Sequence, residues 1–198
     1  MRLLLIGNNM TKPHDARSVL YRKLSEYASS HPVQTECACK IMRFIEKTPD
    51  CFVRSHSAGH ITGSAWLLNP DGSKALLTLH RKLGKWLQLG GHADGDTDTL
   101  RVALREAQEE SGISGIVAVH TQIFDVDIHR IPAHSASAEA EHWHYDVRYL
   151  LRAPHERFCI SSESCALRWF THEEILSPSF PVDESVRRLA KKAMQYNV

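Results

Sequence analysis

The chain has 198 residues, of which 42% are hydrophobic, so it can bury the core of one compact domain with an added segment. Its 24 lysine and arginine residues nearly balance its 23 aspartate and glutamate residues. This balance gives no long-range attraction to nucleic acid or to an anionic membrane, so we expect a small soluble partner molecule.

Two further features bear on the cellular location. The five cysteines lack the paired spacing of a zinc ribbon or a disulfide framework, which favours reduced thiols in a cytosol. The opening MRLLLIGNNM is too short for a signal peptide, and no other apolar stretch approaches the length of a membrane span. We therefore expect a cytoplasmic protein without membrane association.

The first part of the chain has a helical pattern. From about Asp15 to Lys47, apolar residues recur at helical spacing in LYRKLSEYA and ACKIMRFIEK, around a break at SSHP. We interpret residues 1–55 as a helical N-terminal extension and residues 56–198 as the main domain. These helices also offer a surface through which two copies of the chain can form a homodimer.

Strand patterns begin near Gly59. The apolar segments ITGSAWLLN and KALLTLH flank the turn sequence NPDG, which predicts a hairpin. A short strand in KWLQL then leads into Gly90 and Gly91. Further strands are predicted in IVAVHTQIFDVDIH, HWHYDVRYLL and ALRWF.

The clearest helix of the chain lies in DGDTDTLRVALREAQEESG. Leu100, Leu104 and Ala107 share one face, an aspartate or threonine is placed to cap its start, and Gly112 is placed to end it. A last helix is predicted from about Val182 to Gln195. Strands on both sides of a central helix predict an α/β layered sandwich with a mixed sheet.

Three glutamates cluster near the end of the central helix. Residues three and four apart lie on one helical face, so Glu106, Glu109 and Glu110 are expected to project into one shared volume. Arg105 can pair with Glu109 but cannot neutralise all three carboxylates. Magnesium prefers carboxylate and water oxygens and shares its other positions with substrate phosphates. The pattern predicts a magnesium site, with a solvated acidic helix face as the alternative.

The loop Leu89-Gly90-Gly91-His92 precedes this helix. Glycine has no side chain and permits unusual dihedral angles, so the backbone can pass close to groups held by the glutamates. We expect Gly90, Gly91 and His92 to bind the substrate, with backbone amides or carbonyls directed at phosphate or metal.

Together these residues resemble the Nudix hydrolases, whose sequence box reads G-x5-E-x7-R-E-U-x-E-E-x-G-U, where U is aliphatic. The residues that fall in register are Gly91, Arg105, Glu106, Ala107, Glu109, Glu110, Gly112 and Ile113. With the surrounding strands, the resemblance extends from about Gly59 to Phe170. It implies a Nudix-type α/β/α sandwich.

The resemblance also implies an activity, the hydrolysis of a nucleoside diphosphate linked to another group by water that attacks one phosphorus. Magnesium, or manganese in its place, would orient the diphosphate and lower the pKa of a bound water. Glu109 and Glu110 are the expected principal ligands. Glu106 is a further ligand or accepts the proton from water, and Arg105 belongs to the same catalytic group.

One position departs from the box. Thr97 stands where the first glutamate is expected, flanked by Asp94, Asp96 and Asp98. Either a neighbouring aspartate replaces that glutamate, or the aspartates serve to cap the helix. The departure motivates the alternative of a nucleotide-sensing Nudix-fold protein without turnover.

A second alternative is a diphosphate isomerase, because isopentenyl-diphosphate isomerases resemble this fold and use histidine and glutamate around a metal. Their characteristic thiol is not evident here. Cys159 and Cys165 lie outside the segment that is expected to line the site.

Several side chains outside the helix are left with open roles. The sequence does not choose a general base among Glu139, Glu141 and Asp146. His142 and His144 share a strand face, where they can bind a transition metal or, when protonated, a phosphate. Four more histidines fall near predicted strand ends or loops: His80, His92, His129 and His134. Four aromatic residues offer a stacking surface for a nucleobase or pack in the core: Trp66, Trp86, Trp143 and Tyr145.

Overall fold

The computed structural model describes residues 15–81, 84–133, 140–160 and 164–196. Its N-terminal part consists of helices α1 (Ser18–Ser30) and α2 (Thr35–Lys47), joined by a 3-10 turn at Pro32–Gln34. The predicted pair of helices and the break at SSHP are thus confirmed.

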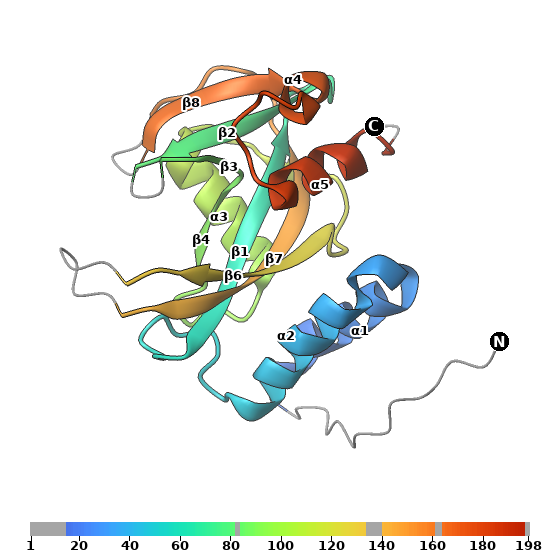
Figure 1. The fold of residues 1–198 in the computed structure, drawn as a ribbon, viewed down its shortest axis with the longest axis vertical. Coiled ribbons are helices and arrows are strands. Elements are labelled where there is room, and N and C mark those ends of the chain that lie inside the picture. The colour runs from blue at the N-terminus through green and yellow to red at the C-terminus, as the bar shows by residue number, and fades with distance from the viewer. Residues whose placement is uncertain (1–14, 82–83, 134–139, 161–163, 197–198) are drawn as a thin grey trace.

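Eight strands of the described residues form one sheet (Figure 1). They are β1 (Gly59–Leu68), β2 (Lys74–His80), β3 (Trp86–Leu87), β4 (Leu89–His92), β5 (Val117–Ala118), β6 (Asp125–Ile131), β7 (His142–Arg152) and β8 (Ser164–Thr171). Strand β1 pairs in parallel with β7 and antiparallel with β2 and β4. The sheet is therefore mixed, as predicted.

The strand predicted in KWLQL is divided in two. Trp86 and Leu87 form β3, which pairs with β2, whereas Leu89 to His92 form β4, which pairs with β1. This division brings the predicted glycine loop into the sheet. Gly90 lies opposite Ser64, and Gly91 lies opposite Gly63.

Three further helices complete the fold: α3 (Thr99–Ser111), α4 (His172–Leu176) and α5 (Glu184–Ala193). Helix α4 was not predicted, and it begins at a capping box in which Thr171 and Glu174 bond each other's backbone N–H groups. Helix α5 begins at Asp183, whose side chain accepts a hydrogen bond from the Val186 N–H.

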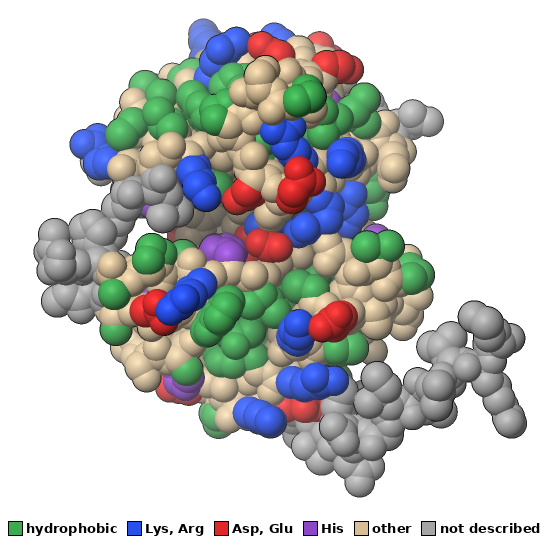
Figure 2. Space-filling view, in the orientation of Figure 1, with side chains coloured by type: hydrophobic (Ala, Val, Ile, Leu, Met, Phe, Trp, Pro, Cys, Tyr) green, Lys and Arg blue, Asp and Glu red, His purple; other side chains and the backbone are tan. Residues whose placement is uncertain are grey.

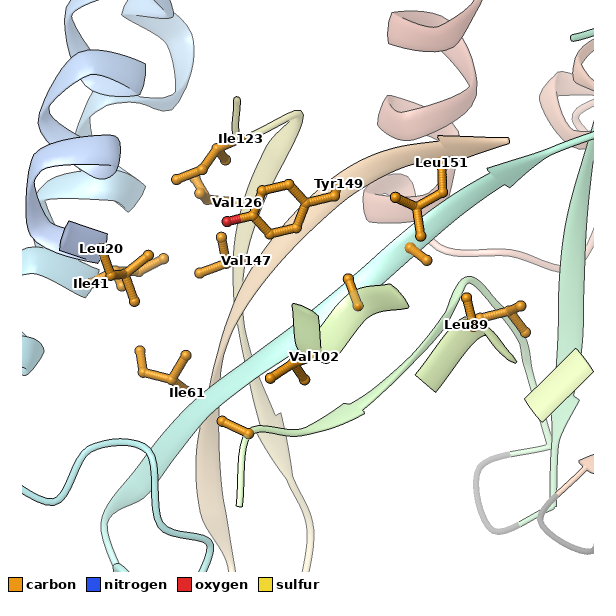
Figure 3. Close-up of a cluster of buried hydrophobic side chains, with 14 of the residues drawn as sticks. Leu20, Ile41, Ile61, Leu89, Val102, Ile123, Val126, Val147, Tyr149 and Leu151 are labelled. Atoms are coloured by element: carbon orange, nitrogen blue, oxygen red, sulfur yellow. The ribbon is translucent and has the colours of Figure 1, made fainter. Parts of the chain in front are cut away.

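Helices cover both faces of the sheet, because alternate strand residues point to opposite sides. On one face, Ile61 and Leu67 of β1 pack in the same core cluster as helices α1, α2 and α3 (Figure 3). On the other face, Trp66 and Leu68 pack with α5. The α/β/α sandwich is confirmed.

The two N-terminal helices share the core of the sheet. Leu20, Leu24, Ile41 and Ile45 are at most 1% exposed and belong to one apolar cluster with the strand residue Val147. The predicted boundary at residue 55 falls in the connection between α2 and β1. The division into an extension and a main domain stays a prediction.

A buried polar network joins the strands to α5 and α1. Arg148 is 2% exposed and forms ion pairs with Asp125, Asp127 and Asp146. Asp125, which is fully buried, also pairs with Lys192 of α5. The Lys192 ammonium in turn donates a hydrogen bond of 2.8 Å to the Tyr27 hydroxyl of α1. Buried charges of this kind are stable only while every partner is present.

Among the described residues, no helix is both long and apolar enough to span a membrane. On the face seen in Figure 2, basic and acidic side chains are interspersed, and a recess across the middle exposes histidine and acidic groups.

Candidate functional site

Helix α3 carries the predicted glutamates, and its two ends are fixed by local interactions. The Asp98 side chain caps the start by accepting hydrogen bonds from the Leu100 and Arg101 N–H groups. Gly112 ends the helix in a left-handed conformation with a φ of 67°, and its N–H bonds the Gln108 carbonyl. The helix is therefore held in register against the sheet.

The buried face of α3 is set by small and branched residues. Val102, Ala103 and Ala107 are fully buried, whereas Leu100 and Leu104 are only partly buried. A Cβ atom added at Gly63 of β1 would lie within 2.8–2.9 Å of Thr99 and Val102. Gly63 therefore lets the helix lie close to β1, which brings its glutamates to the neighbouring strand β4.

Two of the three glutamates converge on β4. Glu110 is 8% exposed, and its carboxylate accepts a hydrogen bond of 3.0 Å from the Gly90 N–H. The Glu106 carboxylate lies where a Cβ atom on Gly91 would be. The glycine pair thus provides both an amide donor and the space that the carboxylates occupy.

Glu109 lies apart from this contact. Its side chain is 64% exposed, and its carboxylate is 4.0 Å from the Arg105 guanidinium. From the helical spacing, all three carboxylates were expected in one volume. A step of three residues and a step of four residues from Glu106 point to different sides of the helix axis, so the side chains of Glu109 and Glu110 diverge. The structure thus brings Glu106 and Glu110 to the same strand and leaves Glu109 mainly in solvent.

Arg105 links the helix to the strand. Its guanidinium donates one hydrogen bond of 2.7 Å to the His92 carbonyl and another of 2.7 Å to the Glu106 carboxylate. The Glu106 hydrogen bond raises the pKa of Arg105 above its usual value. Arg105 therefore holds the Glu106 carboxylate at a defined place beside β4.

The acidic residues around Thr97 all have local partners. Asp94, at a φ of 50°, forms a two-pronged ion pair with Arg54, which lowers its pKa. Asp96 pairs with Arg101, which likewise lowers its pKa. Asp98 caps the helix, whereas Asp94 and Asp96 bind arginine side chains, so the capping interpretation holds for Asp98.

The three general-base candidates differ in environment. Asp146 is 1% exposed, and it accepts hydrogen bonds from Thr62, Ser64 and Arg148. Its carboxylate is therefore enclosed by hydrogen-bond donors and is not open to solvent. Glu141 forms an ion pair with Arg130. Glu139 lies outside the described residues.

The aromatic residues are mostly structural. Trp66 is fully buried, and Trp86 packs edge-on against Phe170. Tyr145 stacks on Phe44 of α2 with ring centroids 3.9 Å apart. Trp143 is 44% exposed and, with Tyr145, lines an open cavity of about 810 Å³ between α2 and the sheet. Of these four aromatic residues, Trp143 and Tyr145 line this cavity, so the cavity is where the predicted stacking surface is accessible.

Histidines gather on the opposite side of β4. The side chains of His60, His92 and His144 place potential ligand atoms within 4.8 Å of one another. In the part of the chain that the structure describes, no other group of three or more His, Cys, Asp or Glu side chains is this close. The magnesium ligands assigned to Glu106, Glu109 and Glu110 therefore stay a prediction.

His60 was missed by the sequence interpretation. It lies near the start of β1, far along the chain from His144, and only the parallel pairing of β1 with β7 sets the two residues side by side. A signal was present in β1, where His60, Thr62 and Ser64 alternate with Ile61 and Gly63 and so predict a polar strand face. His134 lies outside the described residues.

The thiols lie away from the glutamates. Cys159 is exposed, and its Cβ would be 3.1 Å from a Cβ atom on Gly112, at the C-terminal end of α3. Cys165 is exposed on β8.

Comparison with known proteins agrees with this geometry. Residues 60–191 match the family model of the NUDIX domain, so the chain belongs to the Nudix family. The predicted family is thereby confirmed.

A similar curated protein is the putative 8-oxo-dGTP diphosphatase 3 of Mycobacterium tuberculosis, which is 31% identical over 136 residues. The match covers 60% of this chain and 58% of that protein, so the chain spans less than two thirds of its relative's length.

Two solved structures share the fold. A NUDIX-family hydrolase from Clostridium perfringens is 25% identical, with a TM-score of 0.52 over 69% of this chain and 96% of that one. The E. coli dihydroneopterin triphosphate pyrophosphohydrolase is 15% identical, with a TM-score of 0.53 over the same shares, which shows the fold alone.

Proposed function

We propose that the chain is a metal-dependent pyrophosphohydrolase that cleaves a phosphoanhydride in a nucleoside diphosphate linked to another group. The observation that carries this proposal is the contact of α3 with β4. There Glu106 and Glu110 meet the backbone of Gly90 and Gly91, and Arg105 holds one of the carboxylates in place.

The donor set suits a hard cation. Glu106 and Glu110 offer carboxylate oxygens beside a backbone without side chains, and exposed Glu109 is free of a close ion pair, since its Arg105 contact is 4.0 Å. Oxygen donors of this kind favour magnesium, with manganese as a second choice. Glu106, Glu109 and Glu110 would hold the ion, which when bound would neutralise the diphosphate and acidify a water molecule.

The chain's own groups then have distinct tasks. Gly90 and Gly91 leave room for the carboxylates and for a phosphate that approaches them. A side chain at Gly91 would collide with the Glu106 carboxylate. Arg105 fixes the Glu106 carboxylate beside β4 through its hydrogen bond, so this side chain is positioned either as a metal ligand or to accept the proton from the attacking water. His92 contributes its carbonyl to the same arrangement.

The substrate class follows from the family and from one accessible surface. The similar Mycobacterium tuberculosis protein is named for a nucleoside triphosphate, 8-oxo-dGTP, and Trp143 beside the cavity offers an exposed aromatic face for a base. We therefore propose a nucleotide-type substrate and a soluble, cytoplasmic setting.

The test measures product release from a panel of nucleoside triphosphates, nucleotide sugars and ADP-ribose with magnesium or manganese present. Replacement Glu110→Gln or Glu106→Gln is expected to lower kcat/KM by about 10²-fold or more, because it removes a charged oxygen at the reacting centre. Glu26→Gln, on the exposed side of α1, is the matched control and should leave turnover unchanged. Near-normal turnover in both active-site variants would contradict the proposal.

A second function is favoured by a specific observation. Thr97 replaces the first glutamate of the box, and the three aspartates beside it are occupied by Arg54, Arg101 and the helix cap. Such a protein can bind nucleotides without turnover. Tight binding of a nucleotide from the same panel, with no product release by the unmodified chain, would establish this sensor function in place of hydrolysis.

A further inference from the structure

Five histidines lie together on one face of the sheet. In the strand register His60 of β1 lies beside His144 of β7, which in turn lies opposite His129 of β6. His142 is two residues from His144 and therefore points to the same side. His92 comes from β4, so four strands contribute an imidazole.

Three of these rings converge most closely. The ring centroid of His60 is 4.9 Å from that of His92 and 4.8 Å from that of His144, and the His92 and His144 centroids are 5.2 Å apart. Each ring offers a ligand nitrogen within 4.8 Å of the other two. The rings are tilted or perpendicular to one another, so the short distances do not come from flat stacking.

The ring of His60 is a buried polar group with unsatisfied nitrogen atoms. The residue is only 2% exposed, and neither ring nitrogen has a hydrogen-bond partner among the residues that the structure describes. A buried polar group without a partner is costly, so a native protein normally supplies one.

His142 provides a further nitrogen at the edge of the group. Its Nδ1 lies 2.8 Å from the Ala140 carbonyl oxygen, which can only accept a hydrogen bond, so Nδ1 carries a hydrogen. Its Nε2 lies 3.2 Å from the Nε2 of His144 and so faces the same group of rings. A backbone carbonyl that fixes the ring through Nδ1 in this way is typical of histidines that bind metal.

We propose that His60, His92 and His144 bind one divalent transition-metal ion, of which zinc is the representative, with His142 at its edge. Imidazole nitrogens suit zinc, copper, iron and nickel, whereas magnesium and calcium prefer oxygen. Zinc–nitrogen distances of about 2.0–2.1 Å set two nitrogens of a tetrahedral site about 3.4 Å apart. Small side-chain rotations bring ligand atoms that lie within 4.8 Å to this spacing.

This site is separate from the glutamate site. Successive residues of a strand point to opposite sides, and Gly91 faces the Glu106 carboxylate of α3. The His92 side chain therefore faces away from α3, toward His60 and His144. The proposed zinc binding does not depend on the proposed hydrolysis, and it ties together β1, β4 and β7.

The experiment uses the full chain without a histidine tag, freed of metal with a chelator, and titrates it with zinc chloride by calorimetry. We expect about one zinc ion per chain and a higher Tm with zinc, and an excess of magnesium chloride should not displace the bound zinc. Single replacements His60→Asn, His92→Asn and His144→Asn should each weaken zinc binding at least about 10-fold.

Two variants serve as controls. His172→Asn alters a buried histidine on α4 that lies outside the group, and Glu110→Gln alters the glutamate site, so both should bind zinc like the unmodified chain. Retention of stoichiometric zinc by all three histidine variants would overturn the proposal, as would loss of zinc binding in Glu110→Gln.

Cobalt spectroscopy of the unmodified chain decides the matter if a histidine variant fails to fold. Visible absorption of four- or five-coordinate cobalt with nitrogen ligands supports the site. A spectrum of hydrated cobalt, or the strong near-ultraviolet band of a cobalt–thiolate bond, overturns it, because the latter assigns the metal to the cysteines.

Discussion

The two sides of β4 offer opposite chemistry within four residues. On the α3 side, Gly90 and Gly91 leave room for the carboxylates of Glu106 and Glu110. On the other side, His92 joins two imidazoles from β1 and β7. Because side chains alternate along a strand, a single short strand can serve an oxygen-rich site and a nitrogen-rich site without mixing their ligands. The pleat of one strand can therefore keep apart two metals that prefer different ligand atoms.

Replacement Gly91→Ala is expected to have the largest effect on the α3 side and little effect on the other side. The added Cβ atom would displace the Glu106 carboxylate, and a shift of about 1 Å at a reacting group lowers kcat/KM by about 10²-fold. Steady-state kinetics together with zinc titration check this separation.

The same variant has an internal control. If the loss of activity comes from displacement of Glu106, Gly91→Ala should lower kcat/KM less in a Glu106→Asp background, because the shorter side chain leaves room for the added Cβ atom. The two effects will then not add. Simple additivity, or a loss of zinc binding in Gly91→Ala, would show that β4 itself is distorted and that its two sides are not independent.

Replacement Arg105→Lys is expected to have an intermediate effect. Both hydrogen bonds come from Nη2 of Arg105, whose direction the planar guanidinium fixes, whereas the lysine ammonium carries the positive charge on a freely rotating group. Loss of such a positioning contact lowers activity by about 10- to 100-fold. The kinetic assay should show a lower kcat and little change in Tm.

Arg101→Lys is the matched control, because Arg101 lies on the same helix but pairs with Asp96, whereas Arg105 pairs with Glu106. Its turnover should stay close to that of the unmodified chain. An equal decrease in both variants would mean that Arg105 acts through the general charge of the helix and not through its two hydrogen bonds.

Replacement Asp98→Ala is expected to have the smallest effect. It removes the cap of α3 and should lower the free energy of unfolding by about 1 kcal/mol, with both sites otherwise intact. Urea unfolding measures this change. Asp50→Ala is the control, because Asp50 is exposed and its contact with His56 Nε2 is a loose 3.9 Å; this change should alter stability by less than about 0.5 kcal/mol.

Local patterns in the sequence predicted the elements that depend on neighbouring residues. Helix α3, with its cap and the terminating Gly112, and the hairpin of β1 and β2 were both expected. Helix α4 was missed because five residues are too few for a periodic apolar pattern. The family was recognisable because the residues of the box are close together along the chain.

Features that depend on distant pairing could not be predicted in this way. The meeting of His60 and His144 requires the parallel register of β1 and β7, which no local pattern specifies. The exposure of Glu109 likewise depends on how α3 is rotated against β4, and helical spacing alone does not fix that rotation. The sequence therefore named most of the residues that we propose as ligands, but not the two groups into which the fold sorts them.

The contact between Lys192, Asp125 and Tyr27 couples two helices that do not follow one another along the chain. It places a cation from α5 and a hydroxyl from α1 on one fully buried carboxylate of the sheet. A change at Lys192 would therefore alter a partner of the sheet and a partner of α1 at the same time, so the two helices fix each other's positions through Asp125.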